Sequence, residues 1–284
     1  MKLLKVKSTK SWIQWLIAKK YNCSSTSLTP SQKSSYFPYF IRMGIIISTV
    51  SLIQCKKDVI HNIEPTTSMN TTALDINTNS ARSLIKMIPI PGRNFKLSET
   101  EVTIGQYLAF CRETNSHWPE WLEKGNKYNI TTGSDKYYSN KGMSESNVNH
   151  PITGVSADDA NAFCKWMGGW LPTMAEWEYA AKGGINNASA QFSGSDNLDE
   201  IAWCAYNSDE STHSVAQKSA NILGIFDMTG NVSEWVSDSY DKNTRFVKGG
   251  SWSDDAINSS ISSKEKYNQK IKNNRIGFRV CQNE

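Results

Sequence analysis

The sequence predicts an α+β domain with few helices, short strands and much irregular loop. Three segments carry apolar residues at helical spacing, and they are residues 104–113, 157–167 and 174–182. Shorter runs alternate apolar and polar residues, as half-buried strands do, over residues 87–103 around a turn and over residues 151–155. Long polar loops fill much of the remainder, and no internal repeat is visible. A few helices among many short strands are typical of an α+β domain.

Capping residues set the limits of two of the predicted helices. Ser156 offers an N-cap oxygen ahead of acidic residues in the first turn, where the helix dipole favours negative charge, and Gly168 ends that helix. Thr173 and Glu176 have the spacing of a capping box at the start of the next helix, which Gly183 ends.

The charge of the chain is unevenly distributed. The formal net charge is +4, but ten of the 31 Lys and Arg residues, and none of the 27 Asp and Glu residues, lie in residues 1–57. Residues 58–284 therefore carry 21 basic against 27 acidic residues and are mildly acidic. Nucleic-acid-binding proteins usually show a clustered basic face on the folded domain, so we expect no nucleic-acid partner.

An apolar run near the N-terminus indicates export. Residues 43–55 are too short to span a bilayer as a helix, which takes about 20 residues. Basic residues precede the run and it ends at Cys55, so it resembles a bacterial lipoprotein signal in which the cysteine is acylated. An uncleaved anchor or a chance apolar stretch is the alternative, and Met43 is a second candidate translation start. We predict a leader over residues 1–55 and a lipid anchor at Cys55 that holds the protein at the bacterial outer membrane.

The segment after the leader is predicted to be a tether. Residues 56–83 are rich in Asn, Thr and Ser and poor in large apolar residues, so they cannot bury enough surface to offset the cost of ordering. Residues 84–284 have the length and apolar content for one core. The expected order is therefore an anchor, a flexible tether and one folded domain.

Six short blocks follow one another through the predicted domain. They read ETEVT (99–103), PITGV (151–155), LPTMAEWEYA (171–180), GIFDMTGNVSEW (224–235), GGSW (249–252) and IGFR (276–279). In this order they resemble the formylglycine-generating enzyme, or sulfatase-modifying factor, family. The resemblance implies a variant of the C-type lectin fold, held together by buried tryptophans and bound calcium. We accordingly expect Trp177, Trp235 and Trp252 in the core.

The resemblance implies a structural calcium site in the fourth block. It assigns carboxylate oxygens of Asp227 and Glu234 and main-chain carbonyls of Gly230 and Val232 to the ion. This donor set suits calcium, which takes six to eight oxygen ligands. In the alternative, Asp227 caps a turn through Asn231 and Glu234 is solvated.

The resemblance also implies a copper site that this chain lacks. The family's oxidase holds Cu(I) with two cysteine thiolates just after the GGS block, but residues 249–263 contain no cysteine. Serine and aspartate oxygens are hard ligands that do not replace soft sulfur. We therefore expect neither copper nor conversion of a sulfatase cysteine to formylglycine. Iron is not expected either, because the histidines are scattered along the sequence. A spatial grouping of His117, His150 and Asp135 into an iron site is the alternative that the sequence leaves open.

The resemblance places Cys164 and Cys281 near the positions of a family disulfide. In an exported protein such a bridge would be stabilising. Two buried free thiols are the alternative, and Cys111 with Cys204 is another pairing, since connectivity cannot be deduced from sequence.

A polar segment after the GGS block is the candidate ligand-binding face. Residues 253–275 are dense in Ser, Asn, Asp and Lys and occupy the part of the fold where relatives bind peptides or display a variable face. A solvated loop is the alternative interpretation. The candidate residues are Ser251, Trp252, Asp254, Asp255, Asn258, Tyr267 and Arg275.

These features predict a cell-envelope lipoprotein whose domain binds or scaffolds a protein or glycan partner without oxidase activity. Lipoproteins of gliding-motility and secretion machinery are similar in plan. The alternative is a divergent formylglycine-generating or nonheme-iron oxidoreductase that acts on a peptide or thiol substrate.

Overall fold

The structure, a computed structural model, describes residues 85–186 and 190–284. The predicted leader, the anchor at Cys55 and the predicted tether lie outside these residues. Within the described ranges, no helix is long and apolar enough to cross a membrane.

Three helices form where capping signals occur in the sequence. They are α4 (Ile104–Thr114), α5 (Ala157–Trp166) and α6 (Met174–Ala181). Each begins with a complete capping box, in which the N-cap side chain accepts from the third helical amide and that residue's side chain accepts from the backbone amide of the cap. The N-cap predicted at Ser156 and the capping box predicted at Thr173 are thus confirmed. The shorter helical turns are η2 (Glu120–Leu122), η3 (Gly184–Asn186) and α7 (Leu198–Ile201).

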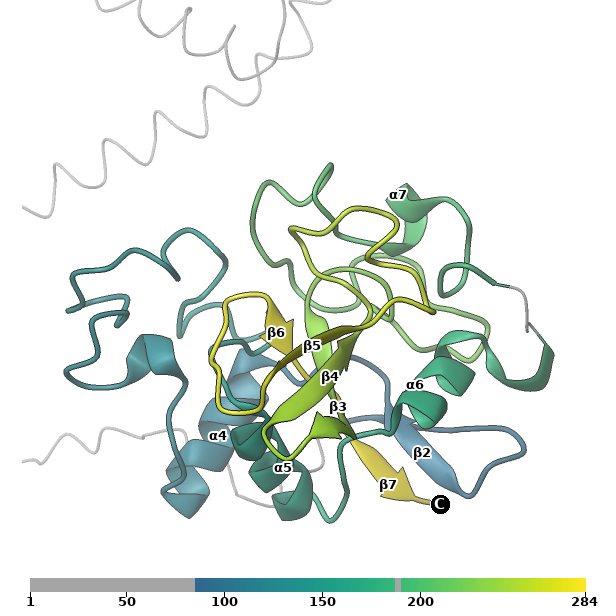
Figure 1. Ribbon diagram of the computed structural model, residues 1–284, viewed down its shortest axis with the longest axis horizontal. Helices are drawn as coiled ribbons and strands as arrows, with labels where there is room; N and C mark the ends of the chain where they lie inside the picture. The colour runs from purple at the N-terminus through teal and green to yellow at the C-terminus, as the bar shows by residue number, and fades with distance from the viewer. Residues whose placement is uncertain (1–84, 187–189) are drawn as a thin grey trace, which may run out of the picture. The chain divides into compact units, whose positions relative to one another are not determined.

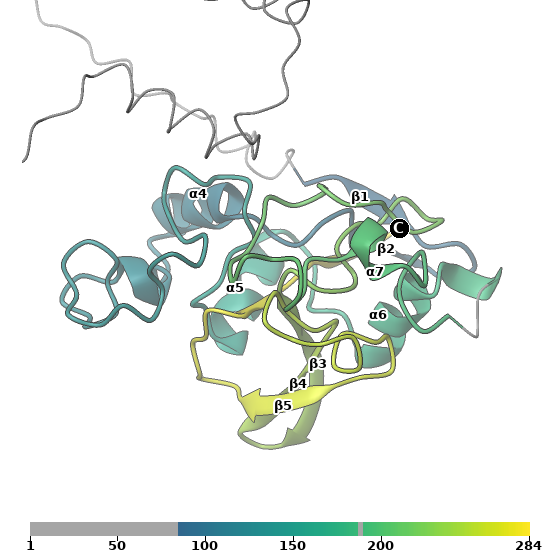
Figure 2. The ribbon, with the colours of Figure 1, turned by 90° about the horizontal axis from the view of Figure 1, so that it is seen from above.

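The strands form two small sheets. The first has the order β1 (Met87–Pro89), β2 (Phe95–Ser98) and β7 (Cys281–Asn283), all antiparallel, so the C-terminal strand lies against the start of the domain (Figure 2). The second has the order β5 (Glu265–Asn268), β4 (Thr244–Lys248), β3 (Ser233–Asp241) and β6 (Ile276–Gly277). Only the β3–β6 pair is parallel. Strand β3 contacts α5 and α6, which flank it in Figure 1.

The predicted strands at 95–103 and 151–155 are shorter than expected. Strand β2 ends at Ser98, and beyond it only an isolated bridge joins Thr103 to Pro151. The physical reason is that the backbone groups of these residues form hydrogen bonds with several loops and not with one neighbouring strand. The Val102 amide donates to the Phe278 carbonyl at 2.9 Å, and the Ile152 amide donates to the Val102 carbonyl at 2.8 Å.

Buried tryptophans hold the domain together, as predicted. Trp177, Trp235 and Trp252 are all buried, and each indole N–H donates to a partner. Trp121, which was not singled out in the sequence, is also fully buried and donates to the Thr153 carbonyl at 2.9 Å. The α+β fold class, with sparse regular structure and long loops, is confirmed.

Candidate calcium and ligand-binding sites

The predicted calcium segment is a tight turn that leads into β3. Asp227 and Asn231 both adopt left-handed backbone conformations, with φ of 57°. Gly230 has φ of 79°, and a Cβ on it would lie 2.3 Å from the carbonyl oxygen of Trp203. Only glycine therefore fits at that position. The turn carries Asp227 and Glu234 into the interior from its two ends.

Glu234 is part of a buried ion pair. Its carboxylate accepts from Arg279 Nε at 2.7 Å and Nη2 at 2.8 Å, and also from Trp177 Nε1 at 2.6 Å. Both charged side chains are essentially excluded from solvent. Glu234 is thus not solvated, which contradicts the alternative interpretation. Its two oxygens accept these three hydrogen bonds, and the calcium-binding role that the resemblance assigns to it stays a prediction.

Asp227 is held differently. Its Oδ2 accepts from the Ala216 amide at 2.7 Å, so it caps a separate loop and does not cap a turn through Asn231. Its Oδ1 accepts no hydrogen bond from any described residue. Asp227 is therefore available as a cation ligand, while calcium and the carbonyl ligands assigned to Gly230 and Val232 stay predictions.

Glu101 completes the buried network, and it was not predicted as a site residue. Its carboxylate accepts from Asn231 Nδ2 at 2.8 Å and from the Val232 amide at 3.0 Å, so it fixes the same turn. It belongs to the ETEVT block, but nothing in that block distinguishes it from the half-buried Glu99.

The network contains more negative than positive charge. Burial raises the pKa of Glu101 well above its ordinary value, and the charges of Asp227 and Glu234 raise it further. Burial also raises the pKa of Asp227 to about 6, with a further contribution from Glu234. One guanidinium, that of Arg279, faces these three carboxyl groups. Such a surplus favours either a bound cation or protonation of the carboxyls.

Four side chains of the candidate ligand-binding face form one polar cluster. Arg275 Nη1 donates to Ser253 Oγ at 3.1 Å and to Asp254 Oδ1 at 3.3 Å, and Arg275 Nη2 donates to the Tyr267 hydroxyl at 3.3 Å. We call Ser253, Asp254, Tyr267 and Arg275 the Arg275 cluster. The Tyr267 hydroxyl donates to Glu265, and burial followed by this contact raises the pKa of Tyr267 to about 12.

The other predicted residues of this face have different positions. Ser251 and Trp252 are buried and support the face from below, since Ser251 donates to Asp254. Asp255 and Asn258 are exposed, and Asp255 accepts from the Asn258 amide in a local turn that does not join the cluster.

A loop that was not predicted as part of the site lies beside the cluster. Asn274, next to Arg275, donates from its side chain to the Tyr137 carbonyl at 2.8 Å. Tyr137 is 38% exposed, and its ring meets those of Tyr128 and Tyr138 at centroid distances of 5.5 and 4.9 Å. In the sequence, the adjacent Tyr137 and Tyr138 were the only sign of a binding surface in this loop. The contact of Tyr137 with Asn274, which is distant in sequence, places the loop at this face.

The structure does not bring His117, His150 and Asp135 together. His117 lies 3.1 Å from Asp159, and His150 lies 3.0 Å from Thr212, whereas Asp135 caps the Tyr137 amide. Across residues 85–186 and 190–284, no three His, Cys, Asp or Glu side chains gather in a metal-binding arrangement.

The predicted disulfide is not formed in this structure. Cys164 and Cys281 are both buried free thiols, as are Cys111 and Cys204, in line with the alternative of free thiols. Burial raises the pKa of each of these thiols, and Cys164 contributes to the shift of Cys281. Thiols with raised pKa values are protonated at neutral pH and poor nucleophiles.

Comparison with known proteins places this fold in a family. The model of the sulfatase-modifying factor enzyme 1-like domain matches residues 75–284. "Chaperone protein LppX" of Paenibacillus barcinonensis is 32% identical over 176 residues, which are 51% of this chain and 60% of that protein. "Inactive C-alpha-formylglycine-generating enzyme 2" of Bos taurus is 32% identical over 123 residues, which are 39% of this chain and 41% of that protein.

A solved structure shows the same fold. The crystal structure of CarF has a TM-score of 0.52 and 24% identity, and the match covers 67% of this chain and 86% of that one. This likeness concerns the fold alone. The family match, in contrast, extends over most of the sequence and includes every block that carries the resemblance. The protein therefore belongs to the family of sulfatase-modifying factor enzyme 1-like domains, the formylglycine-generating enzyme family.

Proposed function

We propose that the protein is a binding or scaffolding module of the bacterial cell envelope and not an oxidase. One observation carries this function: residues 252–263 contain no cysteine where the family's oxidase is expected to hold copper with two. The serine and aspartate side chains in this stretch are hard oxygen donors, which Cu(I) does not select. The chain keeps the fold of the family but lacks the two cysteine thiolates that the oxidase reaction is expected to need for copper.

Two relatives support a function without the oxidase reaction. One is named as an inactive formylglycine-generating enzyme and another as a chaperone. The matches cover 41% and 60% of those proteins, so their names support the proposed function without establishing it.

The binding surface that we infer is the Arg275 cluster together with Tyr137. A guanidinium that is already held in place loses little freedom when a ligand binds, and exposed tyrosine supplies apolar area with a polar tip. Arg and Tyr are enriched among the residues that dominate the energetics of protein interfaces. We therefore infer a segment of an envelope protein as the ligand of this surface, with a glycan as the alternative.

Substitution of Tyr137 tests this surface. We expect Tyr137→Ala to reduce recovery of the partner at least tenfold when the full-length protein is cross-linked in cells and its partners are quantified by mass spectrometry. Tyr240→Ala is the matched control, because Tyr240 is also exposed and its ring contacts Phe246 and Lys266, neither of which belongs to the cluster. Equal recovery with both variants, or no specific partner with the wild type, would count against the proposed function.

The missing thiolates predict that no formylglycine is produced. We expect the purified protein to leave the cysteine of a sulfatase-motif peptide unchanged after incubation with copper and O₂, as read by peptide mass. A known formylglycine-generating enzyme serves as the positive control. Conversion of the cysteine would restore the alternative of a divergent oxidoreductase.

Export and lipid anchoring are proposed from residues 43–55. If Cys55 carries the lipid, Cys55→Ser should move the protein from the detergent phase to the aqueous phase in Triton X-114 partitioning. An unchanged distribution would instead indicate an uncleaved apolar anchor.

A further inference from the structure

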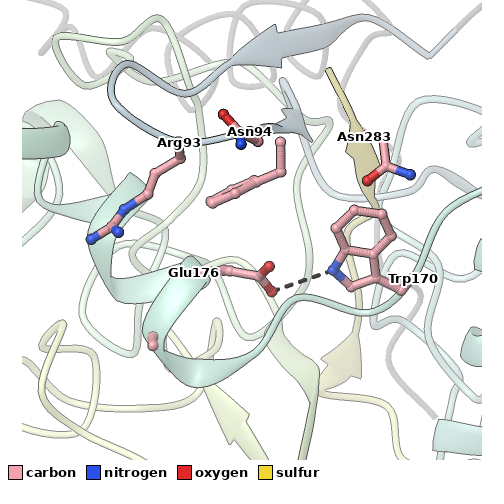
Figure 3. Close-up of a pocket in the computed structure, with 7 residues that line it drawn as sticks. Arg93, Asn94, Trp170, Glu176 and Asn283 are labelled. Atoms are coloured by element: carbon pink, nitrogen blue, oxygen red, sulfur yellow. Dashed lines mark hydrogen bonds between the residues drawn. The ribbon is translucent and has the colours of Figure 1, made fainter.

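A pocket lies at the edge of the three-stranded sheet, built from elements other than those of the Arg275 cluster. It has a volume of about 380 Å³, within the range of small-ligand sites. The turn between β1 and β2, the loop between α5 and α6, the start of α6 and the end of β7 surround it (Figure 3). The side chains used below are Arg93, Asn94, Phe95, Trp170, Glu176 and Asn283.

Two aromatic side chains form a fixed apolar wall. Phe95 is buried, and Trp170 is half-buried with part of its ring open to the pocket. The Trp170 indole donates to Glu176 Oε2 at 3.3 Å, and its backbone pairs with Cys281 through two hydrogen bonds of 2.9 and 2.8 Å. Because both the ring and the backbone of Trp170 are held, the platform is ordered before a ligand arrives.

Polar groups around this wall have unused hydrogen-bonding capacity. Glu176 Oε2 accepts from the Thr173 amide, the Thr173 hydroxyl and Trp170, whereas Oε1 has no donor in the described part of the chain. The side-chain amides of Asn94 and Asn283 have no hydrogen-bond partner among the described residues.

The charges at the pocket balance each other. The Arg93 guanidinium stacks over the Tyr179 ring at 4.3 Å and forms no ion pair within the described ranges. Arg93 repels a free cation and Glu176 repels an anion, so neither kind of ion is favoured. The arrangement instead suits a neutral ligand that presents hydroxyls as both donors and acceptors and one apolar face to the indole.

We propose that this pocket binds one neutral sugar ring of a glycan. The C–H face of the ring stacks on Trp170, as apolar ligand surface does on aromatic walls. The hydroxyls of the sugar donate to Glu176 Oε1 and accept from Arg93. The side-chain amides of Asn94 and Asn283 can both donate to and accept from these hydroxyls. This site is independent of the Arg275 cluster and would give the module a second ligand of different chemistry.

The experiment is a binding screen on the full-length protein in detergent. Saturation-transfer NMR is recorded with neutral methyl glycosides of glucose, galactose, mannose and N-acetylglucosamine, and with a glucuronide and glucosamine as charged counterparts. We expect at least one neutral glycoside to bind with millimolar or tighter affinity and its charged counterparts to bind at least tenfold more weakly. No binding by any neutral glycoside at 10 mM, or tighter binding by a charged one, would overturn the assignment.

Variants locate the site. Trp170→Ala should weaken binding more than tenfold, and Asn94→Ala, in an exposed turn that leaves the core intact, should weaken it about threefold or more. Asn149→Ala is the matched control, since Asn149 is also exposed but lies outside the pocket. If Trp170→Ala does not fold, Asn94→Ala decides the test alone. If Asn94→Ala binds the sugar as tightly as Asn149→Ala does, the sugar binds elsewhere and the assignment is overturned.

Discussion

Replacing Arg279 with methionine is expected to lower the free energy of unfolding by about 3–5 kcal/mol. Arg279 is the one guanidinium that faces the buried carboxyl groups of Glu101, Asp227 and Glu234. Methionine matches much of its volume but leaves Glu234 with only the Trp177 indole as a donor. The cost arises because a buried carboxylate without its partner must either stay charged in a medium of low polarity or take up a proton.

Urea unfolding of the wild type and the variant measures this effect. Two controls separate loss of the ion pair from loss of packing. Adding Glu234→Gln to Arg279→Met should recover part of the stability, because a neutral side chain then replaces the unpaired charge. Lys86→Met removes the surface partner of Glu99 and should change stability by less than about 1 kcal/mol. An Arg279→Met variant that is no less stable than Lys86→Met would contradict a structural role for the buried pair.

The helices of this protein follow from local sequence, whereas the buried network does not. Thr173 and Glu176 lie three residues apart and form the capping box that their spacing predicts. Arg279 and Trp177 reach Glu234 from 45 and 57 residues away, and no local pattern relates them. The resemblance assigned Glu234 to calcium from its own block alone, and its partner Arg279 in the IGFR block was not recognised.

Burial of charged residues was equally hard to predict. Glutamate is rarely fully buried unless it is paired, so an exposed position was the default for Glu101. The structure buries it because the chain leaves strand β2 after Ser98 and passes the turn at Asn231. At the ligand-binding face, Arg275 and Tyr267 were predicted from one polar segment, but Tyr137 reaches them through a contact with Asn274 that spans 137 residues.

The pH dependence of stability should depend on Asp227 in a defined direction. Burial raises the pKa of Asp227 from 3.8 to about 6 in the folded protein. A raised carboxyl pKa means that the folded state favours the protonated form, so the stabilising contribution is fully present below about pH 4 and is lost as pH rises through about 6. A shift of this size corresponds to about 3 kcal/mol.

Asp227→Asn should remove this dependence, because asparagine cannot ionise. It tolerates the left-handed backbone of Asp227 and can still accept from the Ala216 amide. In EDTA, the difference in unfolding free energy between variant and wild type should therefore shift by about 3 kcal/mol in favour of the variant between pH 4 and pH 7.5. Asp255→Asn, the same substitution at an exposed site, should show no comparable shift. Parallel pH profiles of wild type and Asp227→Asn would contradict the raised pKa.

Calcium addition in the same experiment tests the predicted metal site. If calcium binds through Asp227, the ion replaces the proton, and millimolar calcium at pH 7.5 should restore the stability that the wild type loses in EDTA. Asp227→Asn should gain much less from calcium, because a neutral amide attracts the ion more weakly than a carboxylate. Stabilisation of both proteins to the same extent would place calcium elsewhere. No stabilisation of the wild type would mean that protons alone balance the buried charge of Glu101 and Asp227. Glu234, which the family resemblance assigns to the metal, would then be neutralised by Arg279 instead.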